Sequence, residues 1–191
     1  MSLKSYKIKS FPRKQLNNWQ LSGQGTNEYY YTGFDILFKP LKVLENNSYM
    51  DEKPIGSLQP GQFGWGNNDA LGKDTVYVRL TDNSDPNTKP NGYILACTEY
   101  LLCQKPADVD EFIIVSMETS NKHPSMTSEV KEIRTDDNAV EYFSKLKVMP
   151  ENEFIIEKYP YVLENTERIY IQSELEEVCI VATIDSRKFQ T

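Results

Sequence analysis

The stretch Gly61–Leu80 constrains the fold more than any other part of the sequence. Four of the nine glycines in the chain lie between residues 61 and 72, and glycines this dense indicate backbone that turns with positive φ or passes close to another segment. The residues that follow form two alternating rows, Val76, Val78 and Leu80 against Thr75, Tyr77 and Arg79. This alternation predicts a half-buried strand preceded by a tight glycine-rich connection.

A phosphate cradle is the alternative interpretation of this glycine-rich segment, and it is the weaker one. No helix is predicted after Gly72, so no helix N-terminus is available to hold a phosphate. The glycine spacing fits neither the dinucleotide-binding pattern nor the P-loop pattern. We therefore expect a central structural block, whose residues are Phe63, Trp65, Asn68, Asp69, Tyr77 and Arg79.

Aromatic residues near this block leave a second alternative open. Phe63, Trp65 and the run Tyr29–Tyr31 would form a carbohydrate- or receptor-binding platform if they lay on exposed loops. We favour a place in the hydrophobic core, because large aromatic side chains are mostly buried on folding.

Composition and strand spacing predict an all-β fold. The 191 residues include twelve tyrosines and eight phenylalanines, which favour strands, and few windows have the period of an amphipathic helix. Val140–Leu146 fits a short helix or an irregular strand, and we prefer the strand. The predicted organisation is a basic N-terminal arm over residues 1–18, a glycine-rich β module over 19–103, and a β-sandwich, jelly-roll-like module over 104–191.

The formal net charge of −7 is unevenly distributed along the chain. Up to residue 103 there are eleven Lys/Arg and ten Asp/Glu residues, and after it there are ten and eighteen. The first fourteen residues contain no acid and five basic residues, Lys4, Lys7, Lys9, Arg13 and Lys14.

We interpret these five basic residues as an assembly arm that docks on an acidic protein surface, such as a neighbouring copy. A flexible terminus is the alternative. Nucleic-acid binding is not expected, because the body of the chain lacks a basic face. Residues 6–9 also alternate apolar and basic, as a charged edge strand does.

The cysteines and the single histidine indicate no redox or metal chemistry. Cys97 and Cys103 fall in one predicted strand, Tyr93–Cys103, where six residues span about 20 Å, too far for a disulfide. We expect these two and Cys179 to be buried, reduced thiols, as in a protein made in a reducing cytosol. His123 lies in a predicted surface turn. The sequence has no long apolar run and no signal peptide, so we expect the protein to be neither inserted in a membrane nor secreted.

The polar loop after residue 80 could provide oxygen ligands for calcium. Asp82, Asn83, Asp85 and Asn87 are closely spaced, and Asp69 could join them, whereas calcium takes six to eight oxygens. The loop lacks the glycine and distal glutamate of an EF-hand. Asp-Asn-Ser and Asp-Pro are also common turn formers, so we expect a turn and no bound metal.

The order of these segments resembles virion structural proteins of tailed bacteriophages. The resemblance is carried by Thr26–Tyr30, the block Gly61–Gly72, the strand Thr75–Leu80 and the loop Asp82–Pro86. More loosely, the second half resembles a β-sandwich module that often follows such a segment, through three further stretches, Met149–Glu153, Leu163–Gln172 and Val178–Ile184.

This resemblance implies a structural protein of the phage particle, made in the bacterial host cytoplasm and located in the virion. It would be a head decoration, neck or tail accessory protein that contacts other virion proteins and copies of itself. No cofactor, nucleic acid or membrane is implied. An enzyme is not expected, because the chain has one histidine and no nucleophile-elbow, zinc-protease or P-loop motif. Paired acids such as Asp136–Asp137 and Glu176–Glu177 are predicted to be solvated turns.

Overall fold

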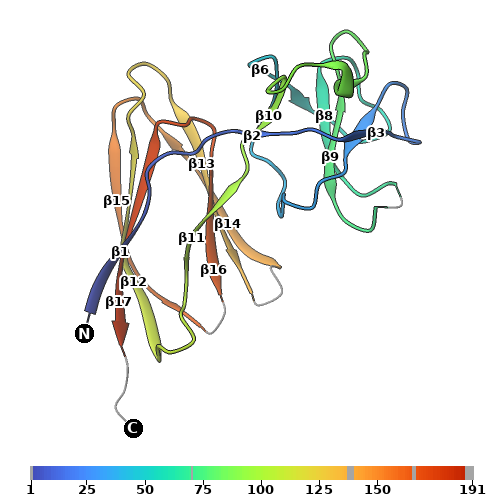
Figure 1. Cartoon of the computed structure of the whole chain (residues 1–191). Helices are drawn as coiled ribbons and strands as arrows, with labels where there is room; N and C mark the ends of the chain where they lie inside the picture. Colours follow the sequence, from blue (N-terminus) through green and yellow to red (C-terminus); the bar gives the residue numbers. More distant parts are fainter. Residues whose placement is uncertain (1, 70, 137–139, 165–166, 188–191) are drawn as a thin grey trace. The chain divides into compact units, whose positions relative to one another are not determined.

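The computed structural model describes residues 2–69, 71–136, 140–164 and 167–187, and these form an all-β protein (Figure 1). By contact density the chain divides into two units, Met1–Pro12 with Glu99–Thr191, and Arg13–Thr98. The first unit is therefore discontinuous in sequence, with the second inserted into it. The predicted boundaries at residues 18 and 103 differ from these divisions because the chain leaves the first unit after Pro12 and re-enters it at Glu99.

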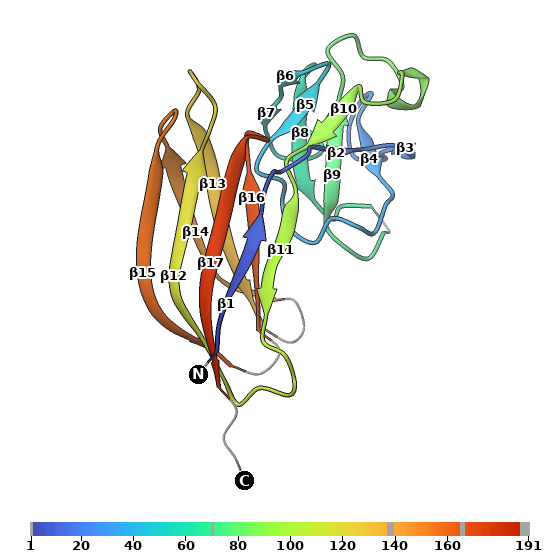
Figure 2. The same cartoon turned by 60° about the vertical axis from the view of Figure 1, so that its left-hand side comes forward.

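The discontinuous unit is a β-sandwich, as predicted. Its strands are β1 (Ser2–Ile8), β11 (Glu99–Gln104), β12 (Glu111–Asn121), β13 (Ser128–Thr135), β14 (Glu141–Met149), β15 (Phe154–Leu163), β16 (Arg168–Ser173) and β17 (Val178–Arg187). They form two antiparallel sheets with the orders β1-β17-β12-β15 and β11-β16-β13-β14, seen as two layers in Figures 1 and 2.

The sandwich core is built from alternate residues of the two sheets. Phe112, Ile114 and Met117 of β12 are buried against Ile169 and Ile171 of β16. Inward residues follow the period of two except at a bulge between residues 114 and 116. The alternating hydrophobic residues of the predicted strands thus face a common interior, as packed sheets require.

The N-terminal residues are part of this sandwich, so the prediction of an arm was wrong. β1 pairs antiparallel with β17 from Ser2↔Ser186 to Ile8↔Ile180, and both figures show it beside β17 at the sheet edge. Tyr6 and Ile8 pack against the core, and the Tyr6 ring lies edge-on to Phe112 with centroids 5.8 Å apart. The alternating pattern of an edge strand was correct, and its apolar residues are what attach the segment.

The inserted unit has two small sheets around a second core. Its elements are β2 (Lys14–Gln15), β3 (Trp19–Leu21), β4 (Tyr29–Tyr31), β5 (Val43–Glu45), β6 (Ser48–Tyr49), β7 (Asp51–Glu52), β8 (Gln62–Gly66), β9 (Thr75–Arg79), the 3-10 helix η1 (Pro86–Thr88) and β10 (Ile94–Ala96). The sheets have the orders β3-β4-β9-β8-β7 and β2-β10-β5-β6. The core includes Leu16, Val43, Val76, Val78 and Ile94.

Three further predictions can be compared with these elements. Residues 141–146 lie in strand β14, which confirms the strand over the helix. The strand predicted over Tyr93–Cys103 is instead two strands, β10 and β11, which belong to different units. Cys97, Cys103 and Cys179 are free and buried, as expected. Asp137 lies outside the described residues.

We predict that Tyr6→Ala destabilises the sandwich by about 1–3 kcal/mol, because it removes an aromatic contact that attaches β1 to the core. Chemical denaturation monitored separately for the two units would measure this change. The matched control is Lys7→Ala, an exposed neighbour on the same strand, which should change stability by less than about 0.5 kcal/mol. Equal stability of the Tyr6→Ala and Lys7→Ala variants would contradict the structural role of β1.

Candidate functional site

The central block is a β-hairpin, formed by β8 and β9. Two of its glycines lie in strand β8, since Gly64 and Gly66 pair with Tyr77 and Thr75 of β9. β9 is buried on both faces except at Arg79, so the expectation of a half-buried strand was wrong. The reason is the central position of β9 in the sheet, between β4 and β8. Val76 and Val78 are buried on one face of the strand, and Tyr77 is fully buried on the other.

Glycine at position 64 allows a second segment to approach β8. A Cβ there would lie 2.6 Å from Cγ2 of Ile55 and 2.9 Å from the carbonyl oxygen of Lys53. These distances are too short for any side chain, so the glycine serves close backbone packing and not a ligand.

The polar residues of the block hold neighbouring loops in place. The Asp69 carboxylate accepts hydrogen bonds from the Ser22 hydroxyl at 3.0 Å and the Gly23 N–H at 3.2 Å. The carbonyl oxygen of Asn68 accepts one from the Gln24 side chain at 2.7 Å. Burial raises the pKa of Tyr77 to about 12, and its hydroxyl oxygen accepts a hydrogen bond from the backbone N–H of Asp69. These contacts leave Asp69 committed to the fold.

The aromatic candidates lie mostly in the core. Phe63 and Tyr31 are buried, and Tyr29 and Trp65 are partly buried and pack against the same cluster. Arg79, at the end of β9, donates to the Asn83 side chain at 2.7 Å and to the carbonyl oxygen of Leu58 at 3.0 Å. The core interpretation is therefore confirmed for Phe63 and Tyr31, and the block is a structural centre.

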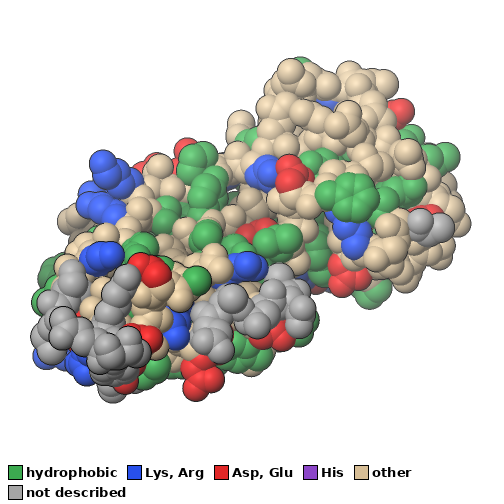
Figure 3. All heavy atoms as spheres, turned by 60° about the horizontal axis from the view of Figure 1, so that its bottom comes forward, with side chains coloured by type: hydrophobic (Ala, Val, Ile, Leu, Met, Phe, Trp, Pro, Cys, Tyr) green, Lys and Arg blue, Asp and Glu red, His purple; other side chains and the backbone are tan. Residues whose placement is uncertain are grey.

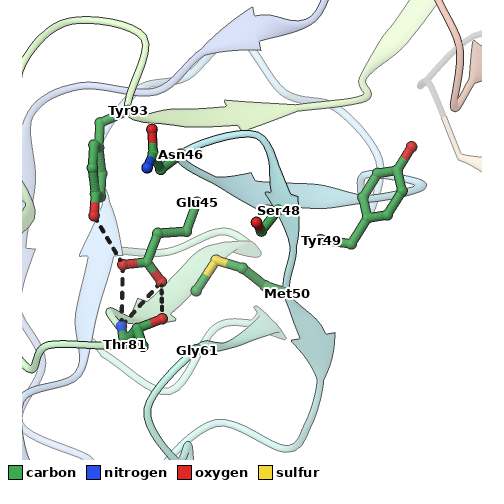
Figure 4. Close-up of a pocket in the computed structure, with 8 residues that line it drawn as sticks. All are labelled: Glu45, Asn46, Ser48, Tyr49, Met50, Gly61, Thr81 and Tyr93. Carbon is green, nitrogen blue, oxygen red and sulfur yellow. Dashed lines mark hydrogen bonds between the residues drawn. The ribbon is translucent and has the colours of Figure 1, made fainter.

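A pocket of about 260 Å³ lies at the end of β5, and sequence reasoning did not find it. Its lining residues are Glu45, Asn46, Ser48, Tyr49, Met50, Gly61, Thr81 and Tyr93 (Figure 4). The tight turn that shapes it contains Asn46 and Asn47, both with positive φ (47° and 64°), a conformation that asparagine tolerates.

A buried carboxylate forms the polar centre of this pocket. Glu45 accepts hydrogen bonds from the backbone N–H of Thr81 at 3.0 and 3.1 Å, and from the Thr81 hydroxyl at 2.7 Å. The Tyr93 hydroxyl donates a longer one of 3.4 Å. Within the described residues, the side chains of Asn46 and Ser48 make no hydrogen bond. Together with the Tyr93 ring, these groups could receive a small polar ligand, while Tyr49 points away from Glu45 (Figure 4).

The candidate calcium loop uses its oxygens within the protein. Lys89 forms an ion pair with Asp82 and, by its hydrogen bond, holds the pKa of that carboxyl well below its usual value. Asp85 caps η1 by accepting the Asn87 N–H at 2.8 Å, and the Asn87 side chain binds both the backbone N–H and the carbonyl of Trp19 at 2.9 Å. Among the described residues no three His, Cys, Asp or Glu side chains are placed to hold a metal.

The five basic residues assigned to an arm are distributed over both units. Lys4, Lys7 and Lys9 are exposed on or next to β1, whereas Arg13 and Lys14 belong to the inserted unit. Lys14 forms an ion pair of 2.6 Å with Asp35. On the face shown in Figure 3, basic, acidic and hydrophobic side chains are interspersed. The described residues include no helix of the length and hydropathy needed to cross a membrane.

The sandwich interior contains a buried ion pair that the sequence did not reveal. Arg134 Nε lies 2.7 Å from Glu132 Oε1, on the same face of β13 as the core residue Val130. The guanidinium stacks on Phe143 and Tyr161 at 4.5 and 3.9 Å from the ring centroids.

Burial, and secondarily the Glu132 charge, raises the pKa of the Cys103 thiol to about 12. This thiol is therefore protonated at neutral pH and unsuited to act as a nucleophile.

One side of the sandwich exposes an unusual number of apolar side chains. Of the seventeen large hydrophobic residues exposed in the described chain, nine lie between residues 140 and 162. We call these nine the apolar edge: Val140, Tyr142, Phe143, Leu146, Val148, Phe154, Ile155, Ile156 and Val162. Eight of them come from β14 and β15, the terminal strands of their sheets, and Val140 directly precedes β14. The apolar edge could not be predicted from the sequence. Apolar residues alternate in the same way in a strand that exposes them as in a strand that buries them.

The comparisons with known proteins returned no match. No protein-family model fits the chain, no curated protein is similar to it in sequence, and no solved structure matches its fold. The arguments for function therefore rest on the apolar edge and on the pocket at Glu45.

We predict that Gly64→Ala destabilises the inserted unit by about 1–3 kcal/mol, because its methyl group would overlap Ile55 and the Lys53 carbonyl. Thermal or chemical unfolding would measure the change. Gly23→Ala is the control, since a Cβ at that position meets only Asp69 Oδ1 at an ordinary 3.6 Å. If both variants were as stable as the parent protein, the close packing of β8 described above would be incorrect.

Proposed function

We propose that the protein is a structural component of a tailed-phage particle, as a head decoration, neck or tail accessory protein. It would act through contacts with other virion proteins and with copies of itself. The proposal assigns it no catalytic group, cofactor, nucleic acid or membrane. The family resemblance suggests this class of protein, and the apolar edge is the observation that carries the argument.

The apolar edge supports a role in protein–protein contacts for a physical reason. Contiguous exposed apolar surface is costly in water and, in soluble proteins, marks sites that another molecule covers. The unpaired backbone of an edge strand adds directional hydrogen bonds to such a contact. The two packed sheets of the sandwich, with their shared core, support this surface.

The test is quantitative mass spectrometry of purified particles from the source, which counts copies of this chain relative to the major shell protein. We expect the chain to be present in a fixed ratio. Hundreds of copies would indicate a head decoration protein, and about a dozen or fewer would indicate a ring or fibre set at the neck or tail. Absence from purified particles would refute the proposal.

A carbohydrate- or receptor-binding module is the second candidate function, and the pocket at Glu45 favours it. An aromatic ring, a carboxylate, a hydroxyl and an amide around about 260 Å³ are the groups that bind the apolar faces and hydroxyls of a sugar. This site would replace the aromatic platform that was the alternative interpretation of Phe63, Trp65 and Tyr29–Tyr31.

A glycan array probed with the full chain tests this second candidate. We expect Ser48→Ala to weaken the binding of any captured saccharide by about 2- to 10-fold, the usual effect of one neutral hydrogen bond. The control is Ser10→Ala, which changes an exposed serine next to β1, outside the inserted unit. An array without binders, or equal binding by both variants, would exclude a saccharide site at this pocket.

A further inference from the structure

One exposed turn of the inserted unit places a glycine directly after an asparagine. Asn91 and Gly92 are the only Asn-Gly pair in the sequence, and they lie between η1 and β10. The backbone N–H of Tyr93 donates to the carbonyl oxygen of Pro90 at 3.1 Å, and Gly92 has a positive φ of 81°. The pair therefore forms the centre of a tight β-turn, with glycine at the position that needs positive φ.

The two groups of this pair that can react with each other are not engaged within the described chain. Asn91 is exposed, and its side chain makes no hydrogen bond to any described residue. The backbone N–H of Gly92 likewise donates to no group in the part of the chain that the structure describes. Because glycine has no Cβ, no side chain hinders the approach of its nitrogen to the preceding carboxamide.

Other asparagines of the chain are held more firmly. The Asn87 amide donates to the carbonyl oxygen of Trp19 and to the Asp85 carboxylate, both at 2.9 Å. Asn121 is buried, and its amide donates to three backbone carbonyl oxygens. Exposure, a glycine neighbour and an uncommitted amide thus coincide at Asn91.

We propose that Asn91 is a site of spontaneous deamidation in the folded protein. The Gly92 nitrogen loses its proton to the solvent and forms a bond to Cγ of Asn91. The bond from Cγ to the side-chain nitrogen breaks, and this nitrogen takes up a proton and leaves as ammonia. Water then opens the resulting succinimide ring, either at Cγ to give aspartate or at the main-chain carbonyl carbon to give isoaspartate. Water is the only co-reactant.

The reaction changes the lining of a second pocket in the inserted unit. Asn91 lines a pocket of about 310 Å³ together with Asn18, Asn87 and Lys89. Either product places a carboxylate there instead of a neutral amide. Since Lys89 already forms an ion pair with Asp82, the new charge is not needed for neutrality, and the pocket becomes more acidic.

Isoaspartate also lengthens the main chain between residues 91 and 92 by one carbon atom. The next residue, Tyr93, contacts two residues of the pocket at Glu45: its carbonyl oxygen accepts the Asn46 N–H at 2.7 Å, and its hydroxyl lies 3.4 Å from the Glu45 carboxylate. A longer chain before Tyr93 disturbs these contacts. The inference does not depend on the proposed function of the protein.

The test is mass spectrometry of the folded full chain, incubated in mildly alkaline buffer and sampled over time. Peptide mapping should find the mass increase of amide-to-carboxylate exchange at Asn91. We expect Asn91 to react at least about 10-fold faster than Asn47, a difference of about 1.4 kcal/mol in activation free energy. Asn47 is the matched control within the same molecule, because it is also exposed and in a turn but precedes Ser48, whose side chain hinders the attack.

A variant and an enzymatic label identify the product. Asn91→Gln keeps an amide but would have to close a larger ring, so the fast reaction should be lost while the melting temperature stays the same. Isoaspartyl methyltransferase should label the incubated parent protein and not this variant. Two results would overturn the inference: an intact Asn91 in the folded protein over a period in which Asn47 reacts, or reaction of Asn91 only after unfolding in urea.

Discussion

The antiparallel pairing of β1 with β17 determines how the rest of the chain is distributed. Because residues 2–8 form the outer strand of one sandwich sheet, the chain must leave the sandwich after Pro12 and return to it at Glu99. The 86 residues between form a unit with its own core. Tyr6 and Ile8 thus make long-range contacts that join the two ends of the sequence. Lys4, Lys7 and Lys9 are exposed on or next to the same edge strand.

Local pattern was sufficient to predict the all-β class, the sandwich and strands such as residues 75–79 and 141–146. It was not sufficient for the position of strands within sheets. Tyr6–Lys9 was correctly read as an edge strand, but its partner lies more than 170 residues away, and nothing in the local sequence indicates it. The break between β10 and β11 is similarly hidden, since Thr98 continues a run that looks like one strand.

The candidate sites were harder to predict, for a related reason. Glu45 is a lone glutamate in the sequence, and only the fold brings Thr81 and Tyr93 to it. Glu28 is likewise fully buried and binds the backbone N–H of Gly56 at 2.8 Å. The loop 82–87, which has the composition of a cation site, instead satisfies its own backbone and Lys89. A carboxylate that stabilises the fold and one that could bind a ligand look alike in the sequence. Only their surroundings in the folded protein distinguish them.

The central claim is that the N-terminal strand belongs to the sandwich, since the insertion of the second unit depends on that arrangement. Native-state hydrogen exchange in increasing denaturant tests it most directly, by comparing amides of residues 3–8 with those of β12 and β17. The account predicts that the β1 amides that bond to β17 open together with these strands, at one free energy. Exchange of residues 3–8 at the rate of an unstructured peptide, with β17 still protected, would contradict it.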